Sequence, residues 1–199
     1  MFSSLGRTIG NVFEFSLPMI IISVVVAVTL RVADIVKNKK EFCFYKELIA
    51  LSFIIYILCL FQVVTFQDNN NISSNNLIPF REMFRYDFGS RLFLKNVLGN
   101  IIMFLPYGFF TSYFFKEKKL SLIFVLTVLT SLTIETTQLM IGRVFDIDDI
   151  LLNILGGVLG HYLYILILKI GDMCPKVFQR EWFLNLVSII LLVGLITLL

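Results

Sequence analysis

Apolar residues along the chain gather into six stretches that are long enough to cross a bilayer as helices. A hydrocarbon core about 30 Å thick requires about 20 mostly apolar residues at a rise of about 1.5 Å per residue. The stretches lie at residues 12–34, 45–66, 95–115, 120–141, 150–169 and 183–199. Because the last is the shortest, a five-span arrangement with a peripheral C-terminus stays open. The pattern predicts an all-α, polytopic membrane protein.

The composition supports this class of protein and excludes some classes of function. Apolar residues make up 58% and aromatic residues 15% of the chain, outside the usual range of soluble globular domains. The apolar stretches use most of the 199 residues, so the length predicts one membrane domain, residues 1–199. The net charge is +3, with the basic residues mainly in loops, which provides no nucleic-acid-binding face. Nucleic acid is therefore not an expected partner.

Basic residues between the stretches predict the orientation in the membrane, because Lys and Arg gather in cytoplasmic loops. They follow the first, third and fifth stretches: Lys37, Lys39, Lys40 and Lys46; Lys116, Lys118 and Lys119; Lys169, Lys176 and Arg180. The long second connection is also basic, so the bias is not uniform. The alternation predicts a multi-pass protein with both termini extracytoplasmic.

The long second connection has two parts. Residues 67–76 form a polar, turn-rich tract that we expect not to be packed. Beyond it, apolar residues recur at helical spacing, at Phe80, Met83, Phe84 and Phe88. This pattern predicts a short helix lying in the outer membrane interface. This helix either serves as an anchor or presents Arg81 or Arg85 to an anionic lipid head group.

Polar residues also stand inside three of the apolar stretches. Glu135 and Gln138 are three residues apart and share a helix face. Asp149 and Asn153 are one turn apart, and Gly156, Gly157 and Gly160 continue the same stripe. Because small residues let helices approach closely in lipid, this stripe is expected to face the interior of the bundle. Asn96 and Asn100 give the third span a comparable face.

These polar faces lie at similar depth. Asn100, Glu135 and Asn153 would each lie roughly 5–10 Å inside the outer end of a helix at about 1.5 Å per residue. The turn between the fourth and fifth spans adds three charged residues, Arg143, Asp146 and Asp148. The sequence therefore predicts an outward-facing polar pocket between the third, fourth and fifth spans.

Structural roles compete with this interpretation. An ionisable residue inside a span is a functional candidate, yet Glu135 could instead form an ion pair with Arg143 or a hydrogen bond with Gln138. The aspartates at 146, 148 and 149 could cap the start of the fifth span. The asparagines at 100 and 153 could bond between helices. For His161, the only histidine, an inter-helix hydrogen bond is the favoured role.

The segment from Asn76 to Tyr162 resembles the VanZ-like family of small bacterial membrane proteins. The resemblance rests on N-L-I-P-F at 76–80, N-I-I-M-F-L-P-Y-G-F at 100–109, I-E-T-T-Q at 134–138 and R-V-F-D-I-D-D-I-L-L-N-I-L-G-G-V-L-G at 143–160. It implies an integral protein of the bacterial cell membrane, and teicoplanin resistance is the family's best-known phenotype. Teicoplanin carries an acyl chain and acts on lipid-linked cell-wall precursors at the outer face, the side on which the pocket is predicted.

Three functions fit these observations. The favoured one is binding of an amphiphile (a membrane lipid, a lipid-linked precursor or the lipoglycopeptide itself) through Asn100, Gln138, Arg143, Asp146, Asp148 and Asn153, with Arg81 and Arg85 as further candidates. The second is an intramembrane enzyme with Glu135 as acid or base, supported by Asp149. The third is a transporter or flippase, suggested by an intramembrane carboxylate and the Pro106/Gly108 break. Carboxylates and amides also suit a divalent cation, but no cofactor is predicted.

Overall fold

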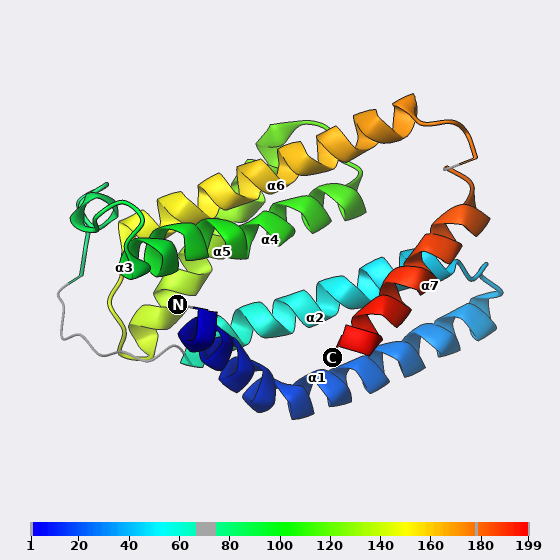
Figure 1. The fold of residues 1–199 in the computed structure, drawn as a ribbon, viewed down its shortest axis with the longest axis horizontal. Helices are drawn as coiled ribbons and strands as arrows, with labels where there is room; N and C mark the ends of the chain where they lie inside the picture. The colour runs from blue at the N-terminus through cyan, green and yellow to red at the C-terminus, as the bar shows by residue number, and fades with distance from the viewer. Residues whose placement is uncertain (1, 67–74, 178, 199) are drawn as a thin grey trace. The chain divides into compact units, whose positions relative to one another are not determined.

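The computed structural model of the protein describes residues 2–66, 75–177 and 179–198 (Figure 1). The long helices are α1 (Phe2–Asn38), α2 (Phe44–Phe66), α4 (Gly99–Phe115), α5 (Leu120–Met140), α6 (Ile147–Met173) and α7 (Glu181–Leu198). A 3-10 turn at Met83–Arg85, the short helix α3 (Arg91–Phe93) and a π-helical turn at Leu94–Leu98 precede α4. The described chain forms no strands, only an isolated bridge between Asn76 and Asp146.

Five segments within the described residues are long and apolar enough to cross a membrane. They are Leu17–Asn38, Phe44–Thr65, Arg91–Phe115, Leu120–Met140 and Ile147–Met173, and Glu181–Gly194 is a shorter apolar helix. These helices confirm the predicted all-α, polytopic class. The protein is therefore a multi-pass membrane protein by its helices, and the predicted five-span alternative corresponds to the five longer segments.

Two compact units make up the chain. One contains Met1–Val63 and Ile170–Leu199, and the other contains Val64–Lys169. The second unit holds every candidate site residue named from the sequence. The single-domain organisation expected from the chain length stays a prediction, and each unit is described separately below.

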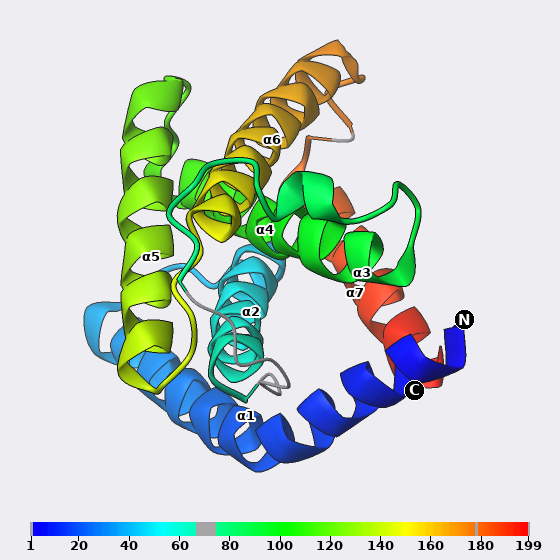
Figure 2. The same ribbon diagram turned by 90° about the vertical axis from the view of Figure 1, so that its left-hand side faces the viewer.

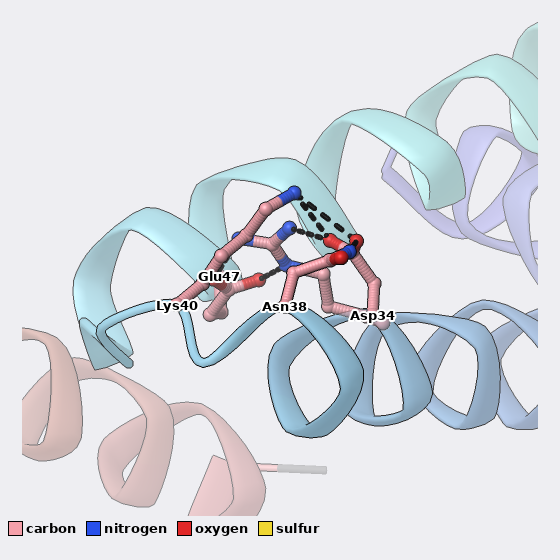
Figure 3. Close-up of polar contacts among 5 residues, drawn as sticks. Asp34, Asn38, Lys40 and Glu47 are labelled. Atoms are coloured by element: carbon pink, nitrogen blue, oxygen red, sulfur yellow. Dashed lines mark hydrogen bonds and ion pairs between the residues drawn. The ribbon is translucent and has the colours of Figure 1, made fainter.

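In the first unit, charged side chains join the end of α1 to the beginning of α2 (Figure 3). Arg31 donates to both carboxylate oxygens of Glu47 at 2.8 Å and to Asp34 at 2.9 Å. Lys40 and Asn38 also donate to Asp34. Bidentate Arg–carboxylate pairs fix geometry as well as charge. This network therefore holds the end of α1 against the beginning of α2. It also pairs the charged side chains at that end of both helices with one another.

Also in the first unit, polar contacts attach α7 to the beginning of α2. Asn185 accepts a hydrogen bond from the backbone N–H of Tyr45 at 3.0 Å, and Lys46 pairs with Glu181 at 2.9 Å. Tyr45 lies in the first turn of α2, where backbone N–H groups have no intrahelical acceptor. The Asn185 side chain therefore supplies the acceptor that the helix itself lacks.

In the second unit, glycines bring α4 and α6 into backbone contact. A Cβ atom at Gly108 would overlap the backbone of Gly157, and one at Gly156 or Gly160 would overlap the carbonyl of Ile101 or Leu105. Only a residue without a side chain allows this approach in lipid. The predicted close-packing stripe at 156, 157 and 160 is confirmed, and it turns the polar residues on the same side of α6 inward.

The interior face of α5 is polar along much of its length. Thr127, Ser131, Glu135 and Gln138 are all buried. Gly142, with a φ of +83°, ends the helix: its N–H donates to Leu139, and the N–H of Arg143 donates to Gln138. This pair of bonds is a Schellman motif, which requires the left-handed conformation that glycine adopts without strain. The termination places Arg143 directly above the last turn of α5.

The prediction of a helix across Phe80–Phe88 is wrong, and the interfacial position of this segment stays a prediction. The chain instead forms turns and a single 3-10 turn at Met83–Arg85, and Phe80 has a φ of +68°. The physical reason is competition for donors. The backbone N–H groups of Phe80, Glu82 and Met83 donate to the carboxylate of Asp148, so they are turned away from the directions that a continuous helix requires.

Candidate functional site

Glu135, Gln138 and Arg143 form one hydrogen-bonded chain at the end of α5. The Glu135 side chain is only 1% exposed. With the Gln138 amide oriented to satisfy both neighbours, its nitrogen donates to Glu135 Oε1 at 3.0 Å and its oxygen accepts from Arg143 Nη1 at 2.8 Å. Arg143 also donates to the carbonyl of Val64 at 2.6 Å. A direct Glu135–Arg143 ion pair does not form within the described residues, because Gln138 bridges them.

Arg143 also donates a hydrogen bond to the C-terminal end of α2. Val64 lies in the last turn of α2, where backbone carbonyls lack intrahelical donors. A guanidinium satisfies such a carbonyl and complements the negative end of the helix dipole. Arg143 therefore joins the last turn of α2 to the end of α5. Its Nη1 atom donates to the Val64 carbonyl and to the Gln138 side chain.

Asp146 connects this chain to α6. Its N–H donates to Glu135 Oε2 at 3.0 Å, and its carboxylate accepts from the N–H of Asp148 at 2.9 Å, as an N-cap residue does. The capping alternative is thus confirmed for Asp146. Burial raises the pKa of the Asp146 carboxyl above its ordinary value, and the hydrogen bond from Asn76 partly offsets that rise.

The Asp148 carboxylate accepts hydrogen bonds from the connection between α2 and α3. It is 1% exposed and accepts from the N–H groups of Phe80, Glu82 and Met83 and from the Asn76 amide. Several N–H donors converge on one carboxylate, an arrangement that stabilises its charge strongly. The structure therefore gives Asp148 a loop-holding role, and its oxygens are occupied by the protein itself.

Asp149 and Asn153 form the inter-helix side of the site. Asn100 donates to Asp149 at 2.5 Å, which joins α4 to α6, and Asn153 donates to Ser131 at 3.0 Å, which joins α6 to α5. Asp149 also lies within electrostatic range of Glu135, Asp146 and Arg143. The predicted convergence of polar groups from the third, fourth and fifth spans is therefore confirmed for these contacts.

One buried acceptor in this cluster, on Asn153, has no donor among the described residues. Asn153 is 2% exposed, yet its Oδ1 atom accepts no hydrogen bond. Asp149 accepts its single side-chain hydrogen bond at Oδ1, from Asn100. A buried acceptor without a donor costs about 1–3 kcal/mol. The side of α6 that carries Asp149 and Asn153 thus has hydrogen-bonding capacity that the described protein leaves unused.

Arg81 and Arg85 lie apart from the buried cluster. Both side chains are exposed, and Arg85 pairs with Glu82 at 3.1 Å. Arg81 makes no side-chain hydrogen bond or ion pair within the described part of the chain. The structure therefore separates these two arginines from the other candidate residues.

Sequence reasoning missed two members of the cluster. Asn76 is buried, donates to Asp146 at 2.8 Å and forms the isolated bridge with that residue, so the expectation of an unpacked tract is wrong at Asn76. The part of the tract at 67–74 lies outside the described residues. Ser131 could have been found, because it lies one turn before Glu135 on the same helix face.

Polar contacts continue deeper between the helices. Tyr107 on α4 shares a 2.7 Å hydrogen bond with Thr130 on α5, and Ser112 on α4 shares a 2.9 Å hydrogen bond with His161 on α6. The inter-helix role favoured for His161 is confirmed. Ser112 and His161 are both almost fully buried, which suits a structural pair that joins two helices in lipid.

The carboxylates are not grouped as a metal centre. Within the described residues, no cluster of three or more His, Cys, Asp or Glu side chains is placed to hold a metal ion. The acidic groups of the cluster instead accept hydrogen bonds from side-chain amides and backbone N–H groups. The chemistry that the arrangement offers is hydrogen-bond acceptance by a carboxylate and an amide inside a largely apolar bundle.

All of these features lie within a segment that known proteins share. The VanZ/LLP1 family model matches residues 53–168, a range that begins in α2 and ends in α6. Protein VanZ from Enterococcus faecium is 32% identical over 112 residues, which are 55% of this chain and 69% of that protein. Comparison with solved structures gives no significant match. On the length of the family match and the identity to this relative, the chain belongs to the VanZ/LLP1 family.

Proposed function

We propose that this protein binds the head group of an amphiphile at the outer face of the bacterial cell membrane and thereby contributes to teicoplanin resistance. The amphiphile would be a membrane lipid, a lipid-linked cell-wall precursor or the lipoglycopeptide itself. The observation that carries the proposal is the buried Oδ1 atom of Asn153, which has no donor among the described residues. It lies one turn from Asp149, whose carboxylate accepts a hydrogen bond from Asn100.

These acceptors favour a head group that donates hydrogen bonds. A carboxylate oxygen and an amide oxygen accept from hydroxyl, amide or ammonium groups and repel a bare phosphate. The guanidinium of Arg143 already donates to Val64 and Gln138. Hydroxyl-rich or ammonium-bearing head groups are therefore the expected ligands of this site.

The remaining network holds the site in place. Both Glu135 oxygens have protein donors, Asp146 N–H and the Gln138 amide, so Glu135 fixes the start of α6 beside the end of α5. Positioned polar groups on rigid helices bind with less loss of entropy than groups on mobile segments. Glu135 is therefore a positioning residue, and Asp149 is the residue proposed to contact the ligand.

Charge bias and family membership support the location and the phenotype. Lys116, Lys118 and Lys119 connect α4 to α5 at the end of the bundle away from the carboxylates (Figure 1). Because basic loops stay cytoplasmic, the carboxylate end is proposed to face outward, where teicoplanin acts. Resistance to this antibiotic is what resemblance to the VanZ-like family implies.

The test is a susceptibility assay in a teicoplanin-susceptible bacterium that produces the wild type, Glu135→Gln, Asp149→Asn or Asp172→Asn. Asp172 is an exposed carboxylate on the same helix α6 and serves as the matched control. At equal membrane abundance, we expect the first two variants to lose the resistance that the wild type and Asp172→Asn confer. Full resistance in all variants would show that the cluster is structural only.

An intramembrane enzyme is the second candidate, favoured by the electrostatic proximity of Glu135 and Asp149. Two interacting carboxylates can divide acid and base roles. The same strains separate this candidate from binding when their lipids and cell-wall precursors are profiled. Binding alone leaves the profile of the wild-type strain equal to that of Asp149→Asn, whereas catalysis makes a lipid or precursor species accumulate in the variant.

A further inference from the structure

Residues 77–90 are fixed at both ends to the beginnings of membrane-spanning segments. At one end, Asn76 bridges to Asp146 and accepts from the N–H of Ile147, the first residue of α6. At the other end, Arg91 begins the span that runs to Phe115. Figure 2 shows this connection across the end of the bundle formed by α4, α5 and α6. Residues 77–90 therefore lie at the level where hydrocarbon meets head groups.

Three backbone N–H groups of this segment point toward the protein. Asp148 accepts the N–H groups of Phe80, Glu82 and Met83, so these donors are satisfied without water. Polar backbone groups are costly in lipid unless they are paired. The Asp148 contact thus removes a main obstacle to placing this non-helical segment against the membrane.

Five apolar side chains of the same segment are exposed. Phe84 is 84% exposed and Phe88 is 93% exposed, and Leu77, Ile78 and Phe80 are also exposed. Phe80 lies near Phe84, and Phe88 lies near Phe93, with ring centroids 6.4 and 5.0 Å apart. Exposed aromatic and aliphatic side chains at this level are stabilised by the boundary between head groups and acyl chains.

The charges of the segment distinguish Arg81 from Arg85. Arg85 is paired with Glu82, so its charge is largely compensated. Arg81 is exposed and unpaired within the described residues, directly beside the outward-facing Phe80. A guanidinium next to an inserted apolar side chain is suited to the phosphate of an anionic lipid.

We infer that residues 77–90 form a lipid-binding element that inserts Phe84 and Phe88 into the membrane interface and binds an anionic phospholipid head group through Arg81. This site is separate from the acceptor cluster of Asp149 and Asn153, and the inference does not rest on the proposed function. It uses the segment's own apolar surface and its one unpaired guanidinium.

Fluorescence quenching tests this inference in the whole 199-residue chain. Phe84→Trp is made in a Trp182→Phe background, since Trp182 is the one native tryptophan, and the protein is placed in vesicles of phosphatidylcholine and phosphatidylglycerol. Lipids brominated near the head-group end of the acyl chain report contact with lipid, and aqueous acrylamide reports exposure to water. Brominating one lipid class at a time gives the preference for anionic over zwitterionic lipid around residue 84.

We expect strong quenching by brominated lipid and weak quenching by acrylamide. We also expect a preference for phosphatidylglycerol of about fivefold, given about 1 kcal/mol for one arginine near an anionic surface. Arg81→Gln should abolish this preference, and the matched variant Arg85→Gln should retain it.

Quenching mainly by acrylamide would overturn the insertion of the segment. Protection from both quenchers would also overturn it, because protein and not lipid would then cover residue 84. An unchanged lipid preference in Arg81→Gln, or an equal loss in Arg85→Gln, would overturn the assignment of the head-group site to Arg81.

Discussion

Asp148 has the clearest structural role of any single residue in the second unit. Replacing it by alanine leaves the N–H groups of Phe80, Glu82 and Met83 without their acceptor. Hydrogen bonds to a charged group contribute about 1.5–3 kcal/mol each, without full additivity. We therefore expect Asp148→Ala to destabilise the protein by about 3 kcal/mol or more.

Thermal unfolding in detergent measures this effect, with Asp87→Ala as the control because Asp87 is exposed in the same connection. Asp148→Asn, which keeps acceptor oxygen but loses the charge, should fall between the wild type and Asp148→Ala. Equal unfolding temperatures for Asp148→Ala and Asp87→Ala would contradict the loop-holding role.

Individual residues differ in how far the sequence reveals them. Glu135, Gln138, Asp149 and Asn153 are recognisable because polar residues at helical spacing stand out against apolar surroundings. Asn76 is not recognisable in this way, since its partner Asp146 lies 70 positions along the chain. A long-range partner also explains why the helix predicted at residues 80–88 does not form. Backbone N–H groups of this segment donate to the Asp148 carboxylate and not to carbonyls of a helix.

At the scale of elements, the α4–α6 contact depends on glycines. A methyl group at Gly108 or Gly160 would overlap backbone atoms of the opposite helix, whereas one at Gly171 on α6 meets nothing within 4 Å. Overpacking of this kind costs about 1–3 kcal/mol, and alanine within an exposed helix is about 1 kcal/mol better than glycine.

Gly108→Ala and Gly160→Ala should therefore lower the unfolding temperature, and Gly171→Ala should leave it unchanged or raise it slightly. The measurement is thermal unfolding of purified protein in one detergent. A Gly160→Ala protein as stable as Gly171→Ala would show that α4 and α6 do not pack through this stripe.

The bounds of α2, α5, α6 and α7 were predictable to within a few residues, because their apolar lengths mark them in the sequence, whereas α1 begins at Phe2, well before the predicted residue 12. The third span differs, since it begins at Arg91 through α3 and a π-helical turn where hydropathy placed its start at residue 95. The start is fixed by a local cap, because the Ser90 side chain accepts from the N–H of Phe93, and hydropathy does not register a capping residue.

At the scale of the whole molecule, the orientation of the helices determines on which side of the membrane the acceptor cluster lies. Basic loops predict that Asp87 faces outward and Lys118 faces the cytoplasm. In a background without Cys43, Cys59 and Cys174, an impermeant thiol reagent should label Asp87→Cys in intact cells. It should label Lys118→Cys only after the cells are permeabilised. The reverse pattern would invert the topology.

The central claim is that the cluster at the ends of α4, α5 and α6 holds an amphiphile through Asp149. Native mass spectrometry of protein purified from its producing cells measures bound amphiphile directly by its mass, whatever its chemical identity. Loss of a charge-assisted hydrogen bond corresponds to about tenfold or more in affinity. The account predicts an adduct on the wild type and on Asp172→Asn that is about tenfold less abundant on Asp149→Asn. The same adduct at the same occupancy on all three proteins would contradict it.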